Sequence, residues 1–216
     1  MRFTIGMFRQ VWAGLLVLLA LTAFVGVLYP AAVWGIGRLG AGSAEGSALR
    51  DSNGCVVGSA LVGVDPQVPA GASDPFFHNR VTGSVADEDA FAPGNPAAAL
   101  PINQGPSSEL LASFVDQRRA AIAARESVPP SSVPVDAVTG SGSGIDPDIS
   151  PEYAQLQVRR VAEVNAMSDD AVRLLVDEHT EGRQFGVLGS PRVNVLELNL
   201  ALGLTAPACG GSPAGG

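Results

Sequence analysis

Residues 138–164 read VTGSGSGIDPDISPEYAQLQVRRVAEV, and in this stretch a loop of small residues leads into a predicted helix. Ser150 is a favoured N-cap residue, and Pro151 suits the first helical position because that position leaves its N–H unpaired. Glu152 adds a negative charge in the first turn, where the helix dipole favours one. The apolar residues that follow recur at helical spacing, namely Ala154, Val158, Val161 and Ala162. The stretch therefore predicts a well-capped amphipathic helix that packs on a core.

The glycines of this loop raise the question of a phosphate-binding site. Gly140, Gly142 and Gly144 alternate with serines, but six residues separate Gly144 from the helix start at Pro151. Phosphate-binding loops place their glycines directly before the helix, or add a lysine, and this chain contains no lysine. A nucleotide site in the loop is therefore not expected.

Two aspartates in the same loop raise the question of a metal site. Asp146, Asp148 and Ser150 imitate the start of a calcium-binding EF-hand loop. That loop needs glycine at its sixth position and glutamate at its twelfth, where this chain has Pro151 and Gln157. We expect Asp146, which precedes a proline, to form a turn instead. No metal or other cofactor is predicted for the chain.

The elements around this stretch indicate an α+β domain over residues 51–202. Helices are predicted after Ser107 or Ser108, up to Pro129, and again from Ser168 to a stop at Gly182. Extended segments are expected at VPVDAVT (133–139), QFGVLG (184–189) and RVNVLELNLAL (192–202), and an Asn53-Gly54 turn in a hairpin. Residues 64–106 are predicted to be a long irregular excursion, and residues 203–216 a disordered tail.

The N-terminal part predicts a single transmembrane helix over residues 11–37. No residue between Arg9 and Arg38 is charged, and about 20 apolar residues suffice to span a bilayer. Trp12, Tyr29 and Trp34 lie near the ends of the span, where aromatic side chains anchor helices at the lipid interface. Residues 1–10 would be a short cytoplasmic tail and residues 38–50 a linker.

The distribution of charge favours a cytoplasmic N-terminus and an extracytoplasmic domain. Arg2 and Arg9 precede the span, whereas all 21 acidic residues of the chain follow it. A cleavable signal peptide with a site in GSAE (42–45) is the alternative, although the apolar run is longer than the ~7–15 residues usual for such peptides. The formal net charge of −8 argues against nucleic acid as a partner.

Few residues suggest catalysis. His78 lies in FFHNR and His179 on the apolar face of a predicted helix, where packing or capping is the simpler role. No catalytic residue is predicted, and Cys55 and Cys209 lack the spacing of a zinc or redox motif, while their pairing stays open. Asn194, Glu197 and Asn199 are interpreted as a solvated strand face, with a contact surface as the alternative.

Five blocks resemble one known family. They are NGCVVGSALVG (53–63), FFHNR (76–80), NQGPSS (103–108), VPVDAVTGSGSGIDPDISPEYAQLQVRRVAE (133–163) and HTEGRQFGVLGSPRVNVLELNLAL (179–202). In this order, behind one N-terminal span, they are similar to the C subunits of bacterial potassium-transporting ATPases, the KdpC family. The chain departs from the usual pattern at Val64, at Val81-Thr82 and within 103–108.

The resemblance implies a non-catalytic subunit of an ATP-driven, high-affinity potassium uptake pump in the inner membrane. Its partners would be the A, B and F subunits and the membrane lipid, and the complex, not this chain, would handle ATP and potassium. The implied role is assembly and stability of the pump, with a possible rise in the ATP affinity of the ATPase subunit. We expect Gly140, Gly142, Gly144, Asp146 and Asp148 to form a loop that contacts a partner. Two alternatives from the sequence are a membrane-anchored hydrolase using His78 or His179, and a ligand-binding module released near Ala44.

Overall fold

The computed structural model describes residues 2–69, 71–80, 90 and 104–205, and the chain forms two compact units, Met1–Ser47 and Ala48–Gly216. The irregular course predicted for 81–103, apart from Ala90, lies outside the described residues. The same holds for the disorder predicted for 206–216. Helices and small sheets together make the second unit an α+β domain, as predicted.

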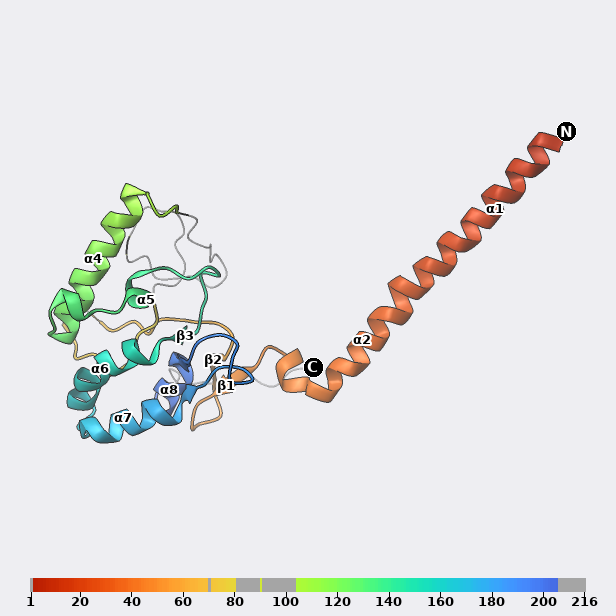
Figure 1. Ribbon diagram of the computed structural model, residues 1–216. Helices are drawn as coiled ribbons and strands as arrows, with labels where there is room; N and C mark the ends of the chain where they lie inside the picture. Colours follow the sequence, from red (N-terminus) through yellow and green to blue (C-terminus); the bar gives the residue numbers. More distant parts are fainter. Residues whose placement is uncertain (1, 70, 81–89, 91–103, 206–216) are drawn as a thin grey trace. The chain divides into compact units, whose positions relative to one another are not determined.

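The first unit is an almost continuous apolar helix (Figure 1). It consists of α1 (Arg2–Ala23), the π-helical turn η1 (Phe24–Leu28), α2 (Tyr29–Gly37), the 3-10 turn η2 (Arg38–Gly40) and α3 (Ala41–Ala44). The run from Gly6 to Ala44 is the one described segment that is long and apolar enough to cross a membrane. Helix thus extends beyond the predicted span at both ends and includes the first part of the predicted linker.

Pro30 explains the π-helical turn within this helix. A proline has no N–H to donate, and its ring clashes with the carbonyl four residues earlier, which is that of Gly26. The Tyr29 N–H donates to the Phe24 carbonyl five residues back, so this turn contains one residue more than a turn of an α-helix. The proline is therefore accommodated inside the helix instead of ending it.

The second unit opens with the predicted hairpin. Strands β1 (Ala48–Arg50) and β2 (Val56–Ser59) pair antiparallel around a turn in which Gly54 has a φ of 80°. One carboxylate oxygen of Asp51 accepts the N–H groups of Asn53 and Cys55, both at 2.9 Å. Cys55 is buried and disulfide-bonded, and Cys209 lies outside the described residues.

Helix α4 (Glu109–Glu126) confirms the predicted cap, because the Ser108 hydroxyl accepts the N–H of Leu111. It ends at Ser127, which has a left-handed φ of 55° and lies two residues before Pro129. The 3-10 turn η4 (Pro130–Ser132) and the short helix α5 (Val135–Val138) follow. The extended conformation predicted for 133–139 is therefore wrong for α5, although Val133, Pro134 and Thr139 on either side of it are extended.

Helices α6 (Pro151–Val164) and α7 (Asp169–Glu178) run side by side and carry much of the core (Figure 1). Ser150 and Ser168 cap them through bonds to the N–H groups of Tyr153 and Ala171, as predicted. Helix α7 ends at His179, earlier than the predicted stop at Gly182. The core also contains side chains from other elements, namely Phe77, Ile122, Val138, Ile149, Val193, Val195 and Leu198.

A small antiparallel sheet of order β3-β5-β4 borders this core. Its strands are β3 (Asp148–Ile149), β4 (Thr180–Glu181) and β5 (Arg192–Asn194). Ile149 and Thr180 both lie opposite the buried Val193. The sheet thus holds the start of α6 close to the last elements of the chain.

The strand predicted over 192–202 is wrong beyond its third residue, because helix α8 (Val195–Ala201) takes its place. Asn194 caps this helix by accepting the Glu197 N–H at 3.1 Å, and leucine is a good helix former. The segment 184–189 is likewise not a strand but a tight turn, closed by two backbone bonds of 2.9 Å between Gln184 and Leu188.

Candidate functional site

The segment Asp74–Arg80 lies across the core without belonging to a helix or strand, and two amide side chains hold it there. Asn199 of α8 accepts the Phe77 N–H at 2.8 Å and donates to the Phe77 carbonyl at 2.9 Å. Gln157 of α6 does the same for His78, at 2.8 and 3.1 Å. Both amides are buried, and each replaces the pair of hydrogen bonds that a neighbouring strand would provide. The solvated strand face predicted for Asn199 is therefore wrong.

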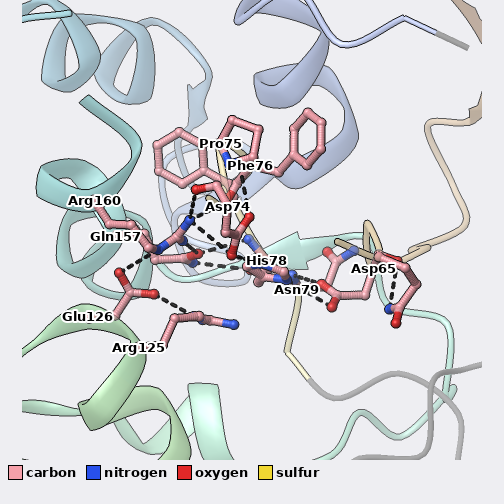
Figure 2. Close-up of polar contacts among 12 residues, drawn as sticks. Asp65, Asp74, Pro75, Phe76, His78, Asn79, Arg125, Glu126, Gln157 and Arg160 are labelled. Atoms are coloured by element: carbon pink, nitrogen blue, oxygen red, sulfur yellow. Dashed lines mark hydrogen bonds and ion pairs between the residues drawn. The ribbon is translucent and has the colours of Figure 1, made fainter. Parts of the chain in front are cut away.

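The imidazole of His78 lies between two carboxylates (Figure 2). Its Nδ1 is 2.9 Å from Asp65 Oδ2, and its Nε2 is 2.6 Å from Asp74 Oδ2. The ring is only 9% exposed, so both contacts are shielded from water. A ring with a carboxylate on each nitrogen can donate to both only as the imidazolium.

The pKa shifts of His78 and Asp74 agree with an imidazolium that is paired with a carboxylate. Burial lowers the pKa of His78, but the hydrogen bonds to Asp65 and Asp74 outweigh it, so the pKa is raised above its usual value. Burial raises the pKa of Asp74, but the bond to His78 and the nearby Arg160 outweigh it, so that pKa is lowered. The imidazolium and the carboxylate therefore stabilise each other's charged form.

The pairing continues from Asp74 into helix α4. Arg160 of α6 lies 3.2 Å from Asp74 and 3.0 Å from Glu126, and it also donates to the carbonyls of Asp74 and Phe76. Glu126 is fully buried and pairs with Arg125 at 2.6 Å on its other oxygen. We call Asp65, Asp74, His78, Glu126 and Arg160 the ionic hub. It joins α4, α6 and the loop at 65–79 (Figure 2).

Arg80 connects this region to the loop predicted to contact a partner. Its guanidinium pairs with Asp146 at 3.2 Å and donates to the carbonyls of Gly140 at 3.0 Å and Thr139 at 3.3 Å. The Asp146 carboxylate also accepts the Asp148 N–H at 3.0 Å, which confirms the predicted turn. Arg80, which belongs to the segment fixed by the amides of Gln157 and Asn199, therefore holds the base of this loop.

The glycines of this loop have different surroundings. Gly142 is exposed, and an added Cβ there would meet nothing within 4 Å. Gly144 is buried, has a φ of 74° and donates its N–H to the Ser141 hydroxyl at 2.7 Å. Gly63 packs against the same loop so closely that a Cβ would lie 2.2 Å from the Asp146 carbonyl oxygen. Only the tip of the loop, around Gly142, is free to meet a partner.

A cleft of about 610 Å³ lies beside the loop and the start of α6. Its ionisable lining is mixed but predominantly acidic, and consists of Arg80, Asp136, Asp146, Asp148, Glu152 and Arg192. Arg192 pairs with Asp148 at 3.1 Å and with Glu181. Among the described residues no group of three His, Cys, Asp or Glu is arranged to hold a metal ion.

Neither histidine has the surroundings of a general base. Both ring nitrogens of His78 contact carboxylates, so no lone pair is available. His179 ends α7, and its Nδ1 lies 2.8 Å from the Leu175 carbonyl oxygen, in agreement with the predicted capping role. Within the described part of the chain, neither ring hydrogen-bonds to a serine, threonine or cysteine.

Sequence reasoning missed the main residues of the hub. Glu126 and Arg160 are not singled out by the sequence pattern, and Gln157 is considered only as the residue at the twelfth position of an EF-hand comparison. The available signal was position: Gln157 falls on the helix face that also contains Ala154, Val158 and Val161. A polar residue at such a position must find a partner inside the protein.

These features define a protein with one apolar N-terminal helix, long enough to cross a membrane, and an α+β domain whose buried charges pair internally. The family model "K+-transporting ATPase, c chain" matches residues 11–203. The chain is 44% identical to the potassium-transporting ATPase KdpC subunit of Streptomyces avermitilis, over 90% of this chain and 93% of that protein. It is also 44% identical to the Kineococcus radiotolerans KdpC subunit (92% and 95% covered) and 43% identical to that of Bradyrhizobium diazoefficiens (91% and 97%). The chain belongs to the KdpC family of potassium-transporting ATPase subunits.

We expect His78→Gln to destabilise the full chain by about 3 kcal/mol near pH 6, because it removes the cation that lies between Asp65 and Asp74. The raised pKa of His78 sets the pH dependence. Its stabilisation is complete below the unfolded pKa of about 6.5 and is lost as pH rises through the folded pKa. Asp74 contributes stability that is fully present above its unfolded pKa of 3.8 and is lost as pH falls through its lowered folded pKa, so it adds no trend between pH 6 and pH 9.

The measurement is thermal unfolding of the detergent-solubilised chain between pH 6 and pH 9, followed by circular dichroism. The stability difference between wild type and His78→Gln should shrink as pH rises. His179→Gln is the control for removal of an imidazole that lies outside the hub. A wild-type advantage that is constant across this range would contradict the charged state of His78.

Proposed function

We propose that this chain is the non-catalytic subunit of an ATP-driven, high-affinity potassium uptake pump, and that it supports the assembly and stability of the complex with the A, B and F subunits. Family membership supports the proposal. The main observation in its favour is that Arg80, two residues after His78 of the ionic hub, binds Asp146 and the Gly140 carbonyl in the loop at 139–148. In this arrangement buried charge fixes a surface loop, which is what a docking element requires.

The loop at 139–148 is the proposed partner contact. Arg80 and the close approach of Gly63 hold its base, while Gly142 at its tip is exposed. A loop that is ordered before binding loses less conformational entropy in the complex, so more of the contact energy becomes affinity. Asp146 and Asp148 then lie at the edge of the acidic cleft, next to the contact.

We further propose that the N-terminus is cytoplasmic and that the domain lies outside the inner membrane. All 21 acidic residues follow the apolar helix, and Arg2 and Arg9 precede it. The disulfide of Cys55 agrees with this placement, because such bonds persist in oxidising compartments. Helix α3 continues through residues 42–44, which favours an uncleaved anchor over release near Ala44.

An extracytoplasmic domain cannot contact a nucleotide in the cytoplasm. Any rise in the ATP affinity of the ATPase subunit would therefore act through the conformation of the partner subunits. This indirect coupling is part of the proposal, and it predicts that loss of docking lowers ATP affinity and complex yield together.

Affinity purification of the tagged full chain from detergent-solubilised membranes tests the proposal, and should recover a P-type ATPase and a large multi-span subunit in constant ratio. Gly142→Val should lower the yield of both partners about tenfold or more, because a branched side chain obstructs the loop tip. Gly182→Val is the matched control, since Gly182 is also exposed with open space around it.

The folded state of both variants is checked by thermal unfolding, which should match wild type. Gly144→Val is unsuitable as a probe because its positive φ would strain any side chain. Purification of the wild type alone, without an ATPase, would refute the subunit assignment. Normal yield with Gly142→Val would show that the loop is a connector.

The Cys55 disulfide gives a test of topology. Alkylation of intact, denatured protein from membranes should leave Cys55 unlabelled, and reduction before alkylation should label it, as read by peptide mass mapping. If Cys55 is alkylated without prior reduction, its thiol is free in the membrane protein. That result would argue for a reducing compartment and against the proposed orientation.

A further inference from the structure

The turn between β4 and β5 exposes three large apolar side chains. Phe185 is 92% exposed, Val187 is 71% exposed and Leu188 is 56% exposed. We call these three residues the apolar tip. Isolated exposed apolar residues are common on protein surfaces, but three within four positions of one tight turn mark a candidate interaction site.

The apolar tip is ordered by its own backbone. The N–H of Gln184 donates to the Leu188 carbonyl and the N–H of Leu188 to the Gln184 carbonyl, both at 2.9 Å. Phe185 has a left-handed φ of 53°, which disfavours a bulky residue and suits asparagine better. Neither the backbone conformation nor the exposure of Phe185 benefits the isolated chain, so both point to a contact made outside it.

The acidic cleft is continuous with this turn. Ser190 and Pro191, which directly follow it, line the cleft together with Asp146 and Asp148. Four carboxylates face two guanidinium groups there, namely Asp136, Asp146, Asp148 and Glu152 against Arg80 and Arg192. Asp148 also lies near Glu181 and Glu197, and burial together with these like charges raises its pKa although Arg192 opposes this. The cleft therefore has uncompensated negative charge next to the apolar tip.

The presence of the apolar tip next to the acidic cleft decides which partner could bind there. An anionic bilayer surface would be repelled by the acidic cleft and by a chain of net charge −8. A second copy of the chain would bring two acidic clefts together. A protein with a basic side chain beside an apolar pocket satisfies both features, since the apolar tip would fill the pocket and the basic group would enter the cleft.

We propose that the apolar tip and the acidic cleft together form the docking surface for a partner subunit that presents an apolar pocket flanked by arginine or lysine. This inference rests on the proposed function and extends it, because it adds residues 185–188 to the contact and states the chemistry of the partner's side. Phe185 is the central anchor, and the cleft sets the orientation of the partner through charge.

The variant Phe185→Asn separates docking from folding. Asparagine accepts the left-handed backbone at this position, so the thermal unfolding midpoint of the full chain should stay the same or rise. The recovery of partner subunits in the affinity purification should fall about tenfold or more, as expected for an interface anchor. Leu174→Asn on α7 is the matched control, because Leu174 is 58% exposed but lies on a different element, and recovery should stay normal.

Photo-crosslinking identifies the occupant directly. The photoreactive analogue p-benzoyl-phenylalanine, placed at position 185 of the tagged full chain in native membranes, should give an adduct with a pump subunit, and the same analogue at position 174 should give none. A lipid adduct, an adduct with a second copy or no adduct at 185 would overturn the inference. If wild type recovers the ATPase but position 185 gives no subunit adduct, the inference alone fails. If wild type recovers no ATPase, the proposed function fails with it.

Discussion

The imidazolium of His78, held between Asp65 and Asp74, is the contact on which the arrangement of the second unit depends. Burying a cation and two carboxylates costs desolvation energy, which mutual attraction offsets only when every polar group has a partner. Here Arg160 and Glu126 complete the set, and the amides of Gln157 and Asn199 satisfy the backbone on which His78 lies. Removing one member would leave the others with uncompensated charge, so the hub acts as a unit.

The hub also links the interior of the domain to its surface. Two residues after His78, Arg80 reaches the loop at 139–148, and beyond that loop β3 and β5 lead to the cleft and the apolar tip. The domain thus combines an apolar core that contains paired buried charges with a surface that exposes glycine, carboxylate and apolar groups. Such a division is suited to a subunit that binds and stabilises its partners and leaves the chemistry to them.

Local features of the fold could be predicted from the sequence. The caps Ser108, Ser150 and Ser168, the Asp146 turn and the apolar helix all depend on residues close in the chain, and all are confirmed. The prediction failed where a local pattern was misleading: the leucines of 196–202 alternate as in a strand, but leucine is also a good helix former and Asn194 caps helix α8. The strands of the β3-β5-β4 sheet have only two or three residues, too few for a periodicity to be recognised.

The candidate site was predictable only in part. The loop residues stood out because their composition is unusual, and the structure places Asp146 and Asp148 at the cleft. The hub could not be predicted, since its bonds join residues as far apart as Asp74 and Arg160, 86 positions along the chain. Nothing in the local sequence of Glu126 or Arg160 distinguishes them from the exposed charges of an ordinary helix, because only tertiary packing buries them.

Amide hydrogen exchange, compared between the free full chain and the chain within the purified pump, tests the central claim most directly. The account predicts slow exchange at residues 77–79 in both states, because the hub fixes this segment before assembly. It predicts slower exchange in the complex than in the free chain at 140–144 and 184–189, where the partner would cover the surface. Fast exchange at 77–79 in the free chain, or unchanged exchange at both surface segments on assembly, would contradict it.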